Sequence, residues 1–293
     1  MDAIKIFEKG ENMLKSNEIY TINENKGVEY LTFNRLLEFP EVKHAYVLKT
    51  NDMNFELGPN RVKMTIARAN FEKACEAIGL DFKGIARPYQ MHTNNVSIVE
   101  ASFNENVSIE ERPDLSGLRF MDTDGLITNL RGVPLATTNA DCNLIFMFDP
   151  VNKVIANVHA GWRGTFDKIA KNAVIKMKEE FGSNPEDILC FICPSIRKCH
   201  YEVGEEVYAR CQEAFEYTGK MDEIASKGDI KEGEQKYYLD LVLPNKLLLL
   251  EEGILEENIV DSGICSYCES SKVHSKRAEG DDFSLSAAII QLN

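Results

Sequence analysis

The chain has 293 residues, 44% of them hydrophobic and 27% charged, a composition typical of globular proteins. Against 33 Lys and Arg stand 47 Asp and Glu, and the formal net charge of -14 disfavours binding to nucleic acid or to an anionic membrane. No basic-then-apolar export signal opens the chain, and no apolar run reaches the roughly 20 residues of a membrane span, so we expect a cytoplasmic protein.

The first half of the chain predicts strands around one helix. Apolar residues recur at helical spacing across residues 60–80, and Gly79 is placed to cap that helix. Strands are expected at residues 28–33, 44–48, 96–99 and 119–129. The last of these would surround a tight Asp-Gly turn. His92 interrupts the strand before residues 96–99, a position where a lone histidine is usually hydrogen-bonded to the backbone.

Residues 135–165 concentrate the side chains that could carry chemistry. Two short apolar runs, 144–148 and 154–158, predict buried strands. Reactive or polar side chains flank these runs, at Asn139, Asp141, Cys142 and His159. A scaffold of strands commonly presents a site in this way, because the sheet fixes the positions of the groups at its ends.

An Ala-Gly-Trp-Arg-Gly loop follows His159 and leads into an expected helix. Apolar residues recur at one helical face across residues 165–181, with Thr165 as the expected N-cap and Gly182 as the C-cap. A helix N-terminus attracts anions, and the Arg163 guanidinium would suit phosphate or carboxylate. An ordinary strand-to-helix turn with a surface arginine explains the motif equally well.

The second half of the chain continues the alternation of strands and helices. Strands are expected at residues 188–193 and 237–241, and helices at 205–217 and 244–252. The charged, poorly periodic residues 219–233 suggest a surface excursion. No internal repeat or linker is visible, so the sequence predicts one continuous domain.

Eight cysteines in a chain without an export signal are better explained as thiols or metal ligands than as disulfides. Two pairs have CxxC spacing, Cys190/Cys193 and Cys265/Cys268, and could together bind zinc through four thiolates. Cys190 and Cys193 lie in an expected strand, where residues three apart point to opposite faces. We therefore favour buried thiols, and the role of the pairs stays open.

His92, Cys142 and His159 together form a candidate ligand set for Zn2+. Two imidazoles and one thiolate leave the fourth tetrahedral position for water or substrate, as catalytic zinc requires. Zinc in such a site makes bound water acidic enough to supply hydroxide near neutral pH. Only the fold could bring ligands so distant in sequence together.

Several segments resemble, in order and spacing, the laccase-domain family, formerly called multicopper polyphenol oxidases and typified by YfiH. These segments are QMHTNNV, DGLIT, TTNADCNLIFMFDP, NVHAGWRGT, PSIRKCHYEVGEEV and YYLDL. The resemblance covers residues 44–293 and implies a mixed α/β (α+β) fold, a compact layered sandwich of mixed sheets flanked by helices in a single domain. Residues 1–43 would be an N-terminal segment packed on that domain.

The resemblance implies zinc bound by His92, Cys142 and His159, and an enzyme of purine nucleoside metabolism. The expected reactions are phosphorolysis of adenosine, inosine, guanosine and S-methyl-5'-thioadenosine, together with adenosine deamination. The expected partners are thus a purine nucleoside and phosphate. We assign Asp141 as the acid that shuttles the proton in deamination, and Arg163 with the following helix terminus as the phosphate cradle.

The chain departs from the family pattern in two segments. The usual Gly-Gly-Val-Ser turn is absent from residues 50–58, and the usual FSYRR and TGR near the C-terminus appear as VHSKRAEGDDF in residues 273–283. Lys276 and Arg277 are candidate equivalents of the family's basic residues there. If these segments hold substrate, specificity or activity has shifted.

Three alternatives to the zinc enzyme remain. Multicopper chemistry is disfavoured, because the chain has 5 histidines and three of them, His44, His200 and His274, have no partner at copper-site spacing. A metal-free cysteine hydrolase would use Cys142 as nucleophile and His159 as base, with Asn139 or the backbone as oxyanion site. A non-catalytic metal- or partner-binding module is the third alternative. The oligomeric state is not predicted.

Overall fold

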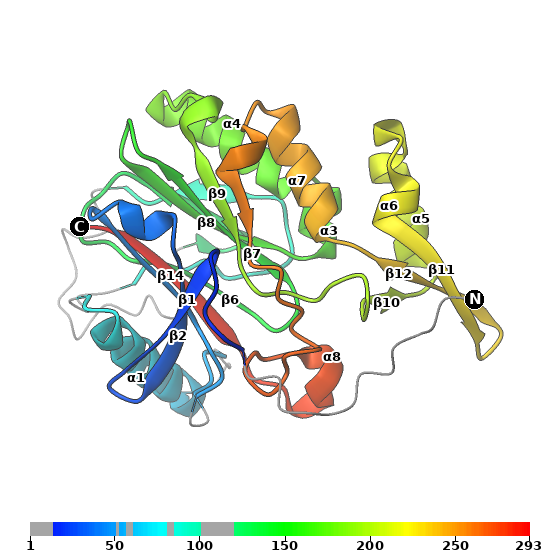
Figure 1. Ribbon diagram of the computed structural model, residues 1–293, viewed down its shortest axis with the longest axis horizontal. Helices are drawn as coiled ribbons and strands as arrows, with labels where there is room; N and C mark the ends of the chain where they lie inside the picture. Colours follow the sequence, from blue (N-terminus) through cyan, green and yellow to red (C-terminus); the bar gives the residue numbers. More distant parts are fainter. Residues whose placement is uncertain (1–13, 51–52, 57–60, 81–84, 101–119) are drawn as a thin grey trace.

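Two sheets packed face to face form the centre of the protein, as Figure 1 shows for the computed structural model. The structure describes residues 14–50, 53–56, 61–80, 85–100 and 120–293. The first sheet is antiparallel throughout, and its strands follow in the order β1 (Tyr20–Asn25), β2 (Val28–Phe33), β3 (Val42–Val47), β14 (Ser286–Leu292) and β6 (Leu135–Asn139).

The second sheet is mixed and carries the chemistry-bearing stretch in its middle. Its strands follow in the order β13 (Ile259–Asp261), β9 (Leu189–Ile192), β7 (Asn143–Asp149), β8 (Val154–Ala160), β5 (Gly125–Thr128) and β4 (Val96–Ile98). Only the pairs at its two ends, β13 with β9 and β4 with β5, are parallel. The predicted strands at 144–148 and 154–158 are confirmed as β7 and β8.

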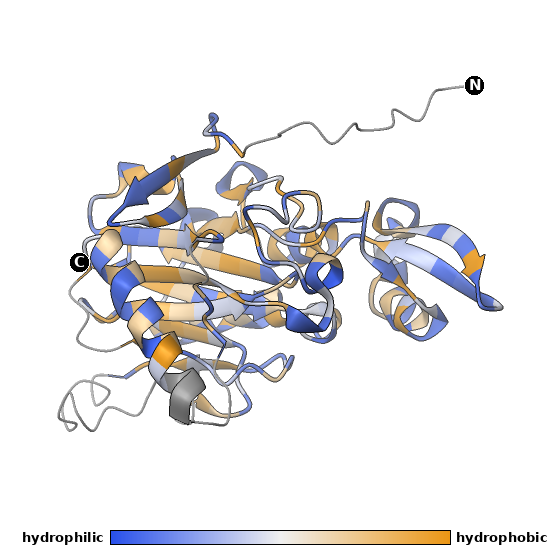
Figure 2. Cartoon of the chain, turned by 90° about the horizontal axis from the view of Figure 1, so that it is seen from below, coloured by the Kyte–Doolittle hydropathy of each residue, from blue (hydrophilic) through white to orange (hydrophobic). Residues whose placement is uncertain are grey.

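Strands β7 and β8 read as continuous apolar runs because both faces of their sheet are covered. Leu144, Phe146 and Phe148 point toward the first sheet, where they join the largest hydrophobic cluster of the protein. Ile145 and Met147 point to the opposite face and pack against helices. Figure 2 shows this apolar character concentrated along the central strands.

Helices cover the outer faces of both sheets and complete a layered sandwich (Figure 1). Helix α1 (Arg61–Ala77) packs on the first sheet through Phe71 and Ala74, and α4 (Ile169–Phe181) and α7 (Val242–Glu251) cover the second. This arrangement confirms the predicted mixed α/β sandwich. Within the described residues, none of the helices has the length and apolar character needed to cross a bilayer.

A smaller unit projects from one end of the sandwich (Figures 1 and 2). It consists of β10 (Glu202–Val203), α5 (Glu205–Phe215), α6 (Met221–Ile224), β11 (Ala225–Lys231) and β12 (Glu234–Leu239). The expectation of an irregular excursion at 219–233 is wrong, because β11 forms a hairpin with β12 there. Most side chains of β11 are exposed, so the strand lacks the apolar alternation that would have predicted it.

Three expectations concern the ends of helices and strands near the site: two are wrong and one is confirmed. Thr165 is not an N-cap, because α3 (Trp162–Phe166) already begins after Gly161, and α4 starts anew after Lys168, whose φ is 69°. Gly182 caps α4 as expected, with φ 69°. The Asp-Gly pair at 124–125 is not a hairpin turn, since β5 begins at the glycine and runs alongside β4 and β8.

The N-terminal and divergent segments fall partly inside the described chain. The hairpin of β1 and β2 forms the edge of the first sheet, and the boundary predicted between residues 43 and 44 falls within β3. Of the divergent segment 50–58, residues 51–52 and 57–58 lie outside the described residues.

Candidate metal centre

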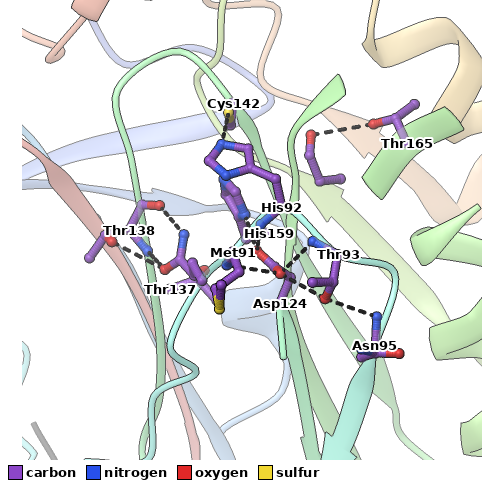
Figure 3. A network of polar contacts seen from close by, with 12 residues as sticks. Met91, His92, Thr93, Asn95, Asp124, Thr137, Thr138, Cys142, His159 and Thr165 are labelled. Atoms are coloured by element: carbon purple, nitrogen blue, oxygen red, sulfur yellow. Dashed lines mark hydrogen bonds and ion pairs between the residues drawn. The ribbon is translucent and has the colours of Figure 1, made fainter. Parts of the chain in front are cut away.

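The structure brings His92, Cys142 and His159 together, as the sequence predicts, and we call these three residues the cavity cluster. Their ligand atoms all lie within 4.8 Å of one another. Strand pairing explains part of this: the β7–β8 register sets Leu144 opposite His159, so the turn before β7 holds Cys142 close by. The Cys142 Sγ lies 3.8 Å from His92 Nε2 (Figure 3).

Asp124 holds the cavity cluster in place through hydrogen bonds, a role that the sequence did not reveal. Its Oδ1 lies 2.8 Å from His159 Nδ1, in a pair that is almost fully buried. Since Nδ1 is engaged there, the Nε2 of His159 is the atom left to bind a metal. A carboxylate behind a histidine ligand is the usual way to fix the orientation of the ring.

The same carboxylate shapes the loop that carries His92. It accepts backbone N–H groups from Met91, His92 and Thr93, at 3.1, 3.0 and 2.7 Å (Figure 3). These bonds hold His92 at φ 63°, a left-handed conformation that costs energy for a non-glycine residue. Burial alone would raise the pKa of Asp124, but the bonds to His159 and Thr93 outweigh it and lower that pKa.

Charge within the cluster favours a thiolate. Burial alone would raise the pKa of Cys142, but the neighbouring imidazoles of His159 and His92 lower it to about 6. Burial would lower the pKa of His159, yet the Cys142 thiolate and Asp124 raise it to about 9. The cluster therefore already stabilises the deprotonated sulfur that a metal ion requires as its ligand.

Gly161, which follows β8, leaves no room for a side chain. A Cβ at this position would lie 2.6 Å from His92 Cδ2 and 3.2 Å from Cys142 Sγ. The glycine of the Ala-Gly-Trp-Arg-Gly loop thus allows the backbone to approach two ligands closely. Another signal of close packing is Thr165, whose hydroxyl donates to the Ala160 carbonyl at 3.3 Å.

The cavity cluster opens onto a cavity of about 370 Å³. Two cations, Arg87 and Lys276, and two aromatic rings, Tyr89 and Phe283, line it; Lys276 opens the short helix α8 (Lys276–Glu279). Burial lowers the pKa of Arg87 to about 10, which leaves it charged near neutral pH. The remaining lining residues are Glu56, Gln90, Thr138, Asn139, Ala140 and Leu285.

Asp141, the candidate acid, directs its carboxylate to the C-terminal part of the chain. It accepts the hydroxyls of Ser266 and Ser275, each at 2.6 Å, and the backbone N–H of Arg277 at 2.8 Å. Its φ of 94° is a further left-handed value beside the cluster. The residues lining the described cavity include its neighbours Ala140 and Cys142, but not Asp141 itself.

Arg163, the candidate phosphate ligand, lies on the surface. Its guanidinium carbon stacks 4.3 Å from the centre of the Trp162 ring, and α3 around it has only five residues. It is absent from the described residues that line the cavity. The geometry therefore offers Arg87 and Lys276 as cavity cations, neither of which the residue pattern alone had assigned to phosphate.

The two CxxC pairs do not meet, so no four-cysteine zinc site forms from them. Cys190 packs toward the helices and Cys193 toward the first sheet, on opposite faces of the β9 region as expected. Both thiols are buried. Asn139, the candidate oxyanion donor, directs its amide nitrogen at two backbone carbonyls, those of Cys142 and Pro194.

Comparison with known proteins finds relatives whose names come from purine nucleoside metabolism. A purine nucleoside phosphorylase from Bacteroides thetaiotaomicron is 33% identical over 194 residues, which cover 66% of this chain and 67% of that protein. The purine nucleoside phosphorylase YlmD of Bacillus subtilis is 36% identical over 157 residues, 54% of each chain. A protein named adenosine deaminase RL5, from an unknown prokaryotic organism, is 31% identical over 204 residues, 69% of this chain and 73% of that one.

Solved structures share the whole architecture. The YfiH protein of Bacillus licheniformis superposes with a TM-score of 0.79 at 26% identity, over 93% of this chain and 99% of that one. YlmD of Geobacillus stearothermophilus, at 24% identity, shares the fold with a TM-score of 0.76 over 94% of this chain and 100% of that one. The model of the family described as multi-copper polyphenol oxidoreductase laccase matches residues 49–293. The chain therefore belongs to this laccase-domain family, whose curated relatives are named as purine nucleoside phosphorylases and an adenosine deaminase.

Proposed function

We propose that the protein is a zinc-dependent purine nucleoside phosphorylase that also deaminates adenosine. The observation that carries the proposal is a three-residue ligand set, His92, Cys142 and His159, at the wall of a cavity. Two nitrogens and one sulfur suit zinc, and three protein ligands would leave one position for water or substrate. A zinc ion held there would supply Lewis-acid chemistry to a bound substrate. The proposed substrates are adenosine, inosine, guanosine and S-methyl-5'-thioadenosine.

The residues of the chain divide the remaining work. Asp124 fixes the His159 ring and the loop of His92, so the ligands are positioned before substrate arrives. The rings of Tyr89 and Phe283 offer flat apolar surfaces against which a purine can stack. The walls of the cavity would also exclude water from the ribose during phosphorolysis.

Phosphorolysis needs a cationic site for phosphate. We place it at Arg87 and Lys276, because both line the cavity and Arg87 is held in a buried position. A phosphate oxygen would attack the anomeric carbon of the ribose while the bond to the purine nitrogen breaks, and its electrons would leave with the base. Arg163 remains the alternative cradle that the sequence predicts.

The sequence assigns Asp141 as the acid in deamination, whereas its contacts favour a positioning role. Because its carboxylate accepts three hydrogen bonds from residues 266–277, it would act through the position of the adjacent Cys142 and of Lys276. An Asp141→Asn variant that lowers both activities equally would support this positioning role. A variant that loses deamination alone would support proton transfer by Asp141.

The decisive experiment incubates metal-analysed protein with adenosine and with inosine, with and without phosphate. We expect phosphate-dependent release of the free base with formation of ribose 1-phosphate, and phosphate-independent conversion of adenosine to inosine. Lys276→Ala should raise the KM for phosphate while sparing deamination, and Arg163→Ala is the matched surface variant. If Arg163→Ala alone shows that split, the phosphate cradle lies at the surface loop.

One rival uses the same residues without metal. The pKa of Cys142 is low and two histidines lie beside it, an arrangement that would also suit a cysteine hydrolase. Asn139 fits poorly as an oxyanion donor, since its amide nitrogen already contacts two carbonyls. Full activity of protein stripped by a chelator, together with inactivation by a thiol-alkylating reagent, would favour the hydrolase over the zinc enzyme.

A further inference from the structure

A second group of metal-binding side chains lies outside the cavity. Cys199 and His200 lie in the loop between β9 and β10, and Cys265 and Cys268 follow β13. Their ligand atoms all lie within 4.8 Å of one another, although Cys199 and Cys265 are 66 residues apart. We propose that these four residues, called the surface cluster, bind a structural zinc ion.

The distances within the surface cluster fit a tetrahedral ion. With Zn–S near 2.3 Å and Zn–N near 2.0 Å, a tetrahedron separates two sulfurs by about 3.8 Å and a sulfur from a nitrogen by about 3.5 Å. The Sγ of Cys199 lies 3.6 Å from that of Cys265 and 4.0 Å from that of Cys268. The Nδ1 of His200 lies 3.2 Å from Cys199 Sγ and 3.4 Å from Cys268 Sγ.

The imidazole of the cluster is held in an orientation that suits coordination. Tyr267, which lies between the two cysteines of the CxxC pair, stacks on His200 with ring centres 4.1 Å apart and planes at 15°. The backbone N–H of His200 donates to the backbone carbonyl of Arg197 at 2.9 Å. Ring and backbone are therefore both fixed with Nδ1 toward the sulfurs.

The two chain segments are joined by contacts besides the cluster. Arg197 forms two hydrogen bonds with the Asp261 carboxylate, at 2.9 and 2.8 Å, and donates to the Ile264 carbonyl at 3.1 Å. The backbone N–H of Ser266 donates to the backbone carbonyl of Ser195 at 3.0 Å. The scaffold thus brings the four ligands together in advance, as a structural metal site requires.

Four protein ligands fill a tetrahedron, which distinguishes this site from the cavity cluster. A zinc ion with three thiolates and one imidazole has no position for water or substrate. None of the four side chains is among the described residues that line the cavity. The role of the ion would therefore be structural, because it would hold the C-terminal segment against the loop before β10.

The link between these two segments would also stabilise one wall of the cavity. The segment after Cys265 supplies the Ser266 and Ser275 hydroxyls that hold Asp141, the neighbour of Cys142. It also carries Lys276 into the cavity lining. The surface cluster would therefore fix the position of one ligand of the cavity cluster and of one cavity cation, without contact with substrate.

The test measures metal content in the full chain. Protein purified with reductant should contain about two zinc ions per chain, and Cys199→Ser/Cys268→Ser should contain about one. Cys142→Ala should also lose about one ion, but from the other cluster. Cys75→Ala, which removes a buried thiol remote from both clusters, should keep both ions.

These variants separate this proposal from the proposed function. If only the surface cluster binds zinc, the wild type holds about one ion, which survives Cys142→Ala and is lost with Cys199 and Cys268. Zinc content unchanged by the double substitution would overturn the proposal. A disulfide between Cys199 and Cys265 in the freshly purified protein would also overturn the proposal, because it would remove two of the four ligands.

A direct measurement covers the case in which the double variant does not fold. X-ray absorption at the zinc edge of Cys142→Ala should show about three sulfur ligands and one nitrogen ligand per ion. A zinc shell of oxygen and nitrogen alone would contradict the surface cluster as its site. The cobalt-substituted protein offers the same distinction, since thiolate-to-cobalt charge-transfer absorption grows with the number of thiolates.

Discussion

The cavity cluster and the surface cluster use the same kinds of side chain, cysteine and histidine, in two different arrangements. His92, Cys142 and His159 provide three ligands at the wall of a cavity, whereas the surface cluster provides four, none of them among the described residues that line this cavity. An open coordination position is what catalysis needs, and a closed shell is what structural stabilisation needs. Ligand number and access, more than ligand type, thus separate a reactive centre from a structural tie.

The largest expected effect tests this division directly. Cys142→Ala should lower kcat/KM for phosphorolysis by about 1000-fold, or about 4 kcal/mol of barrier, because the cavity loses its Lewis acid. Its Tm should change little. Cys268→Ser should instead lower the Tm by roughly 5 °C, the shift expected for about 3 kcal/mol in a chain of this length. Steady-state kinetics and calorimetry check both arms; a matching loss of activity and Tm in the two variants would erase the distinction.

A smaller effect is expected from the carboxylate behind the cavity cluster. Asp124→Asn should reduce metal affinity or activity by roughly 10- to 100-fold, since the variant weakens the support of His159 and of the loop carrying His92. Zinc competition with a chromogenic chelator measures the affinity. Asp122→Asn is the control, because Asp122 is an exposed carboxylate that accepts a bond from Asn95.

If Asp122→Asn weakens zinc binding as much as Asp124→Asn, the effect comes from the loop and not from orientation of the ligand. In the surface cluster, stacking on Tyr267 orients the histidine. Asp124→Asn should therefore leave the zinc of the surface cluster in place, and metal analysis of the variant shows whether it does.

The cavity cluster could be predicted from the sequence, and the reasons are local. Its ligands lie at the ends of strands whose two buried faces produce continuous apolar runs, and the resemblance to the laccase-domain family named the same three residues. The support by Asp124 could not be foreseen in this way. An Asp-Gly pair signals a turn over a few residues, whereas the partners of this carboxylate lie about 30 residues away on either side.

The surface cluster was hidden for a different reason. The sequence pairs Cys265 and Cys268 with the other CxxC pair, but Cys190 and Cys193 are committed to opposite faces of a sheet. The adjacent Cys199 and His200 were the available signal. Only the contact between the β9–β10 loop and the segment after β13 shows that they belong together.

Close packing around the cavity cluster gives a third, weaker perturbation. Gly161→Ala would place a methyl group 2.6 Å from His92 Cδ2 and should lower zinc affinity by roughly tenfold, about 1.4 kcal/mol, as the ligands shift. Gly204→Ala is the matched control, because no heavy atom lies within 4 Å of its added Cβ. Unchanged zinc affinity in Gly161→Ala would show that the His92 loop moves without cost.

The last perturbation concerns acid pH, where loss of metal from either cluster must be separated from unfolding of the core. His44 is buried between the sheets, its Nε2 accepts the Phe33 N–H at 2.7 Å, and burial lowers its pKa from 6.5 to about 3. The unfolded chain therefore binds the proton first. The stability that neutral His44 provides is complete above about pH 6.5 and falls toward pH 3, by up to about 1.4 kcal/mol per pH unit.

His44→Gln should remove this slope, because an amide oxygen can accept the same N–H without titrating. Denaturant unfolding of wild type and variant at several pH values between about 3 and 6.5 measures the difference. In the variant, the remaining acid dependence reports proton competition for the ligands of the two clusters. If the slopes of wild type and variant are equal, His44 is not the core group that takes up the proton, and acid sensitivity resides in the metal clusters themselves.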